Sequence, residues 1–99
     1  MTPRLVLREP GYYRLEGTVD FGTPMPPALW SPDIVPANGR ATIELGGLER
    51  ADSVALALLV EWGRRARAAG FRLVIADAPD RLRALIRVTG LEALLAEGV

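Results

Sequence analysis

A strand–helix–strand unit constrains the fold of this chain more than any other feature. Residues 41–45 alternate between apolar and polar side chains, which predicts a strand with one face in water that ends at Leu45 before a short loop. Residues 53–69 carry apolar side chains at helical spacing, and Gly70 is a typical C-terminal stop. A β-rich apolar run follows at residues 72–76. A helix that joins two neighbouring strands implies that these strands are parallel.

The N-terminal third is predicted to contain a hairpin and a proline-rich segment. Residues 4–8 and 12–16 have the pattern of two short strands, and the Pro-Gly pair between them favours a turn. Residues 22–36 hold five prolines, which favours irregular structure with one short helix. In this interpretation the segment holds Leu29 and Trp30 against the core.

The C-terminal part is predicted to close the domain with a second helix. Residues 78–80 favour a helix start, because proline and an acidic side chain suit the first turn. Gly90 is the predicted end of this helix, and residues 91–95 predict a last amphipathic turn that seals the core. Residues 1–99 are therefore predicted to form a single α/β domain, a mixed β-sheet with helices mainly on one face.

Composition excludes most catalytic chemistry. The chain has no His and no Cys, which removes imidazole bases and thiolate zinc sites. All twelve basic residues are Arg, so neither a Lys nor a His can activate Ser53 as a nucleophile. The glycine-rich fingerprints of nucleotide-binding loops are also missing. We therefore expect no enzyme activity, no catalytic residue, no metal and no cofactor.

Charge and hydropathy narrow the choice of partners. Twelve basic and twelve acidic residues cancel, which disfavours nucleic acid as a partner. The longest uncharged run, residues 21–32, carries four prolines, whereas a membrane span needs about 20 apolar residues. No basic leader precedes an apolar core at the N-terminus. The sequence thus predicts a cytoplasmic chain without direct membrane insertion.

The start of the helix at residues 53–69 is unusually apolar, because residues 54–60 form a run of seven uncharged residues. At about 100° per residue, the predicted inward face consists of Ala55, Leu56, Leu59, Trp62, Gly63 and Ala66. Val54, Ala57 and Glu61 fall on the opposite face, where Glu61 can pair with Arg64 or Arg65. Exposed Val54 and Ala57 predict a docking surface for a protein partner.

Asp52 and Ser53 stand where this helix begins, and N-capping explains part of their presence. The residue three positions after Ser53 is Leu56, so a reciprocal capping box is absent. A phosphate on Ser53 would meet the positive end of the helix dipole, with Arg50 nearby. Ser53 is therefore a candidate phosphoacceptor and the centre of the predicted docking surface.

The helix start also carries a family resemblance. Residues 51–59, Ala-Asp-Ser-Val-Ala-Leu-Ala-Leu-Leu, resemble the signature of STAS domains, in which Asp, then Ser or Thr, any residue and Gly-Leu open a helix. This chain has Ala55 where the family has glycine. The similarity covers roughly residues 40–95. Within the family, the Pro-Ala-Leu-Trp run at residues 27–30 is most similar to the MlaB branch, whose members are small cytoplasmic subunits of Mla phospholipid-transport ABC complexes.

The resemblance implies a STAS-like fold and a non-enzymatic accessory subunit that binds an ABC transporter ATPase subunit. It implies that this partner contacts Asp52, Ser53, Val54, Ala57 and Glu61. The chain would then lie at the cytoplasmic face of the inner membrane through its partner. STAS domains also include anti-sigma factor antagonists, so the alternative is a signalling module that an anti-sigma factor kinase switches by phosphorylation of Ser53. The apolar patch also offers a surface for homodimerisation of the free chain.

Overall fold

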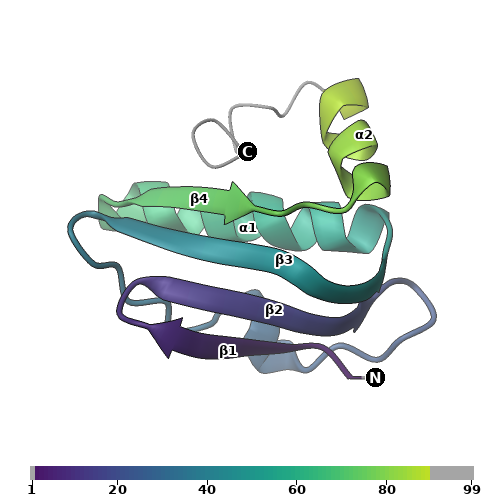
Figure 1. The fold of residues 1–99 in the computed structure, drawn as a ribbon, viewed down its shortest axis with the longest axis horizontal. Helices are drawn as coiled ribbons and strands as arrows, with labels where there is room; N and C mark the ends of the chain where they lie inside the picture. The colour runs from purple at the N-terminus through teal and green to yellow at the C-terminus, as the bar shows by residue number, and fades with distance from the viewer. Residues whose placement is uncertain (1, 90–99) are drawn as a thin grey trace.

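The computed structural model describes residues 2–89 and shows a four-stranded sheet that α1 covers on one side (Figure 1). The strands stand in chain order, and they are β1 (Arg4–Glu9), β2 (Tyr12–Val19), β3 (Arg40–Ala51) and β4 (Arg72–Ala76). β1 and β2 are antiparallel, whereas β2, β3 and β4 are parallel to one another. The predicted hairpin, parallel crossover and mixed sheet are confirmed.

The helices lie mainly on one face of the sheet, as predicted. α1 (Ser53–Ala69) runs behind the sheet in Figure 1, and α2 (Asp80–Thr89) packs against α1 beyond β4. The 3-10 helix η1 (Pro27–Trp30) also contacts α1. The predicted helix end at Gly90 and the predicted turn at residues 91–95 lie outside the described residues.

The core lies between α1 and the sheet. Its least exposed large side chains include Leu15, Ile43, Leu45 and Ile75 from the strands and Leu58, Leu59 and Trp62 from α1. The indole Nε1 of Trp62 donates to the carbonyl oxygen of Leu29 at 2.8 Å, which satisfies a buried polar group and joins η1 to α1. Leu29 is buried as predicted, but Trp30 is 36% exposed and does not enter the core.

The buried face of α1 is wider than the sequence predicted. Leu58 was absent from the predicted inward face, yet its side chain is fully buried in the core that also contains Leu29. Besides the sheet, both η1 and α2 contact α1, so more than one side of the helix is covered. Gly63, which was predicted to face inward, is half-buried.

β3 is longer than predicted. The sequence predicted a strand end at Leu45 and a loop before α1, but β3 continues to Ala51. Residues 47–51 pair with residues 16–19 of β2 after shifts in register, so the second half of β3 belongs to the sheet. β4 pairs with β3 at residues 40–44. The prediction of a loop was therefore wrong.

Gly46 and Gly47 favour a loop by local propensity, and this is why the sequence predicted a loop after Leu45. Two shifts in strand register, between residues 44 and 47 and between residues 48 and 50 of β3, accommodate them within the strand. The Gly46 N–H donates to the carboxylate of Glu44. A Cβ atom on Gly47 would lie 2.7 Å from Nε of Arg14, so glycine leaves room for Arg14 to reach Glu44 at 3.0 Å.

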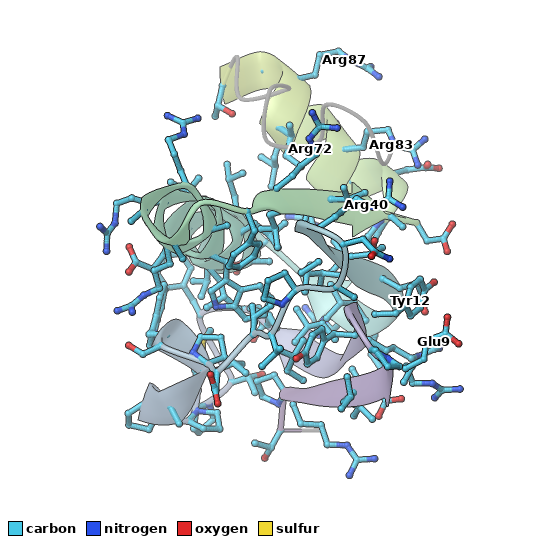
Figure 2. All side chains as sticks on the ribbon, turned by 90° about the vertical axis from the view of Figure 1, so that its left-hand side faces the viewer. Glu9, Tyr12, Arg40, Arg72, Arg83 and Arg87 are labelled. Atoms are coloured by element: carbon cyan, nitrogen blue, oxygen red, sulfur yellow. The ribbon has the colours of Figure 1, made fainter. Side chains whose placement is uncertain are left out.

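The face of the sheet away from α1 is polar. Arg4 donates to Glu16 at 3.2 Å in addition to the pair between Arg14 and Glu44. Figure 2, in which α1 lies to the left, shows Tyr12 on the opposite side of the sheet. Within the described residues, the main apolar core lies on the side of the sheet that α1 covers, and Val74 of β4 is a buried apolar side chain on the other face.

Truncations at a buried and an exposed position of α1 test which of its side chains belong to the core. Leu58→Ala should lower the free energy of unfolding by about 2–5 kcal/mol, because it leaves a cavity in a fully packed site. Val60→Ala, on an exposed position of the same helix, should change it by no more than about 0.5 kcal/mol. Urea unfolding followed by circular dichroism measures both. Equal losses in the two variants would contradict the burial described for α1.

Candidate docking surface

Asp52 joins the start of α1 to the end of β2. As the N-cap of α1, its Oδ1 accepts a hydrogen bond from the Val54 N–H at 2.8 Å, and its Oδ2 accepts from the Phe21 N–H at 3.1 Å. The Asp52 N–H donates to the carbonyl oxygen of Val19 at 3.2 Å. A carboxylate here satisfies a free helix N–H and favours the positive end of the helix dipole. The cap is therefore Asp52, and Ser53 is the first helical residue.

The first two turns of α1 expose an uncharged surface. Ser53, Ala57 and Val60 are exposed and follow one another at helical neighbour spacing; we call these three residues the α1 surface. Val60 was not among the predicted site residues, although its position three residues after Ala57 could have identified it. Within the described residues, the Ser53 hydroxyl has no hydrogen-bond partner.

Val54 lies at the border of the α1 surface. The sequence placed it on the face in water, but its side chain is half-buried and packs against the core. The segment after β2 approaches this end of α1 through the hydrogen bond between Phe21 and Asp52, and the sequence pattern of α1 alone does not report that approach. A substitution at Val54 would therefore affect folding as well as binding.

Glu61 is paired within the chain, as predicted. Its carboxylate accepts hydrogen bonds from Arg64 at 3.0 and 2.8 Å and from Arg65 at 2.7 Å. Arg65 also donates to the Ser31 hydroxyl at 2.8 Å, which connects α1 to the segment after η1. The hydrogen bonds from Arg64, with those from Arg65, lower the pKa of Glu61 to about 2. Glu61 therefore borders the α1 surface with its charge compensated.

Two hollows flank Asp52 at this end of the sheet. One of about 300 Å³ lies between β3 and the start of α2, and Arg50, Pro79 and Arg81 line part of it. The other, of about 530 Å³, is lined by Phe21 and its neighbours. Among residues 2–89, no group of three or more acidic side chains is arranged to hold a metal ion. Within the same range, both helices fall short of the length and hydrophobicity that a transmembrane helix requires.

The pKa of Glu61 gives a direct test of its pairing. A side-chain pKa of about 2, against 4.5 for the free group, means that folded Glu61 stays charged where the unfolded chain binds a proton. Its contribution to stability is therefore present above about pH 4.5 and is lost as the pH falls toward 2. An NMR titration of the Glu61 carboxyl should give a midpoint near 2.

The controls change one charged partner at a time. Arg64→Gln should raise the midpoint, because it removes the strongest hydrogen bonds to the carboxylate. Glu61→Gln should make the free energy of unfolding fall less steeply with decreasing pH across the same window. A wild-type midpoint at the ordinary value for Glu would show that the pairing does not persist in solution.

Comparison with known proteins agrees with this architecture. A family model described as Mlab, STAS domain, matches residues 31–96, a range that contains β3, α1, β4 and α2. No curated protein matches the chain. The family match covers more than half of the sequence and includes the capped start of α1. The chain therefore belongs to the MlaB-like STAS family, whose members are small accessory or regulatory domains that are generally not catalytic.

Proposed function

We propose that this chain is a non-catalytic accessory subunit that binds the cytoplasmic ATPase of an MlaFEDB-type phospholipid-transport ABC complex. The single observation that carries the proposal is the α1 surface. A helix at the surface of a domain normally presents charged side chains to water, whereas the first two turns of α1 expose Ser53, Ala57 and Val60. An uncharged patch of this kind suits the centre of a protein interface.

The hydrogen bonds that hold α1 in place mean that the α1 surface needs little rearrangement when a partner binds. Asp52 fixes the start of α1, and the bond from Trp62 to Leu29 holds its middle against η1. Arg65 joins the helix to Ser31. Because these contacts exist before binding, association loses less conformational entropy than it would from a mobile surface.

The proposed action on the ATPase is allosteric. A bound subunit shifts a conformational equilibrium only by its difference in affinity for the two conformations. The chain would therefore support transport by binding the competent conformation of the ATPase more tightly than the other. Binding would also place the chain at the cytoplasmic face of the inner membrane through its partner.

Affinity purification tests the identity of the partner. The tagged chain is purified from its own host, and co-purifying proteins are identified by mass spectrometry. We expect the ATPase subunit of an ABC transporter. Recovery of a serine kinase with no ABC ATPase would overturn the proposal.

A charge at Ala57 should abolish docking without unfolding the domain. Ala57→Glu places a carboxylate at the centre of the α1 surface, where desolvation without a partner is costly. We expect at least a tenfold loss of affinity for the purified ATPase. Ala68→Glu is the matched control, because Ala68 is exposed on the same helix about three turns away. Equal binding by both variants and the wild type would contradict the proposed surface, provided that thermal unfolding shows both to be folded.

A second candidate function depends on Ser53. An anti-sigma factor antagonist would be switched by an anti-sigma factor kinase, and Ser53 is exposed at the first position of α1. The helix N-terminus favours a phosphate, and the side chain of Arg50 is 79% exposed. The Asp52 carboxylate opposes this reading, because it already accepts from the helix start and would repel a phosphate. Phosphate on Ser53 in the chain purified from its host, together with a co-purified kinase, would favour this function.

A further inference from the structure

We infer that the partner surface extends from α1 to Phe21, and that the Phe21 ring enters an apolar pocket on the partner ATPase. The inference rests on the proposed function, because it names a further contact residue for the same partner. Phe21 is 83% exposed, although an aromatic ring gains from leaving water. Aromatic side chains are enriched among the few residues that dominate the binding energy of interfaces.

The turn that carries Phe21 is attached to the start of α1. The Phe21 N–H donates to Oδ2 of Asp52 at 3.1 Å, and the Thr23 N–H donates to the carbonyl oxygen of Asp20 at 3.3 Å. The segment after β2 and the start of α1 lie at the same end of the molecule (Figure 1). The bond to Asp52, the residue before Ser53, therefore holds the Phe21 backbone beside the start of α1.

Polar and charged side chains border Phe21. The hollow of about 530 Å³ beside the ring is lined by Phe21 together with polar side chains that include Thr18, Arg50 and Asp52. Arg50 lies 3.7 Å from Asp20, so opposite charges meet at the border of this hollow. Phe21 is thus a single apolar side chain with a polar border, and a polar rim around apolar contacts is the usual arrangement of a protein interface.

Other exposed apolar side chains lack this arrangement and serve as controls. Leu7 is 60% exposed near the end of β1, which lies at the opposite end of the sheet from the start of α1 (Figure 1). Val88 is 84% exposed near the end of α2. Neither is attached to the cap at Asp52 by any described hydrogen bond.

Asp52 is the positioning residue for Phe21, and Asp52→Asn separates its two bonds. Asparagine caps helices as well as aspartate, so its Oδ1 can still accept from the Val54 N–H. Its NH₂ group cannot accept from the Phe21 N–H. In this variant the Phe21 amide should exchange faster with solvent while the Val54 amide stays protected, and affinity for the partner should fall severalfold. A capping role alone would leave both the Phe21 amide and the affinity unchanged.

Binding of Phe21 variants to the purified ATPase tests the anchor itself. Phe21→Ala should weaken binding at least tenfold, and Phe21→Leu should retain most of the affinity because it keeps an apolar side chain. Leu7→Ala and Val88→Ala should bind like the wild type. Thermal unfolding should show no loss for Phe21→Ala, since the ring is 83% exposed.

The outcomes separate the inference from the proposed function. If the wild type binds the ATPase and Ala57→Glu does not, then wild-type affinity in Phe21→Ala overturns the anchor and leaves the proposed function intact. If the wild type does not bind the ATPase, the proposed function fails, and the assignment of Phe21 to that partner fails with it.

Discussion

The carboxylate of Asp52 determines how α1 leaves the sheet, and the surface features at this end of the domain depend on it. β3 ends at Ala51 and α1 begins at Ser53, so Asp52 is the entire connection between them. A connection of one residue allows little variation in the direction of the helix. That direction follows from the hydrogen bonds that Asp52 makes to Val54, Phe21 and the end of β2. One carboxylate oxygen of Asp52 binds the first turn of α1 and the other binds the turn at Phe21. The position of this turn relative to the start of α1 is therefore fixed.

Packing on the inner side of α1 explains the fold but not the character of its outer side. Leu58 and Trp62 fill the core, and Ala55, which stands where the family has glycine, is 1% exposed with its methyl group in the same core. That departure from the family signature therefore leaves the exposed face unobstructed. Ala57 and Val60 contribute little to folding, and the last turns of the same helix carry arginines on their outer side. The change from uncharged to charged along one exposed face is the property that folding does not account for.

The sequence predicted correctly the features that depend on residues close together in the chain, and it failed where residues distant in the chain interact. The hairpin, the bounds of α1 and the pairing of Glu61 depend on neighbouring residues, and periodicity predicted them. The length of β3 could not be predicted, because its second half pairs with β2 and Gly47 serves the side chain of Arg14. The half-burial of Val54 reflects its packing against the core, which the periodicity of α1 did not predict. Phe21 lies in the segment after β2, where prolines and glycine remove any periodic signal.

The identity of the cap also bears on the choice between the two candidate functions. If Ser53 were the cap, its hydroxyl would be bound to the helix backbone, and phosphorylation would have to break that bond. Asp52 takes this role, so the Ser53 hydroxyl remains exposed for a partner. The same carboxylate raises the electrostatic cost of a phosphate on the next residue. A neutral Ser53 in a docking surface needs no compensation for this charge, whereas a phosphorylated Ser53 would require a cation, and Arg50 already lies 3.7 Å from Asp20. The charges around the helix start therefore favour the proposed docking function over the proposed phosphate switch.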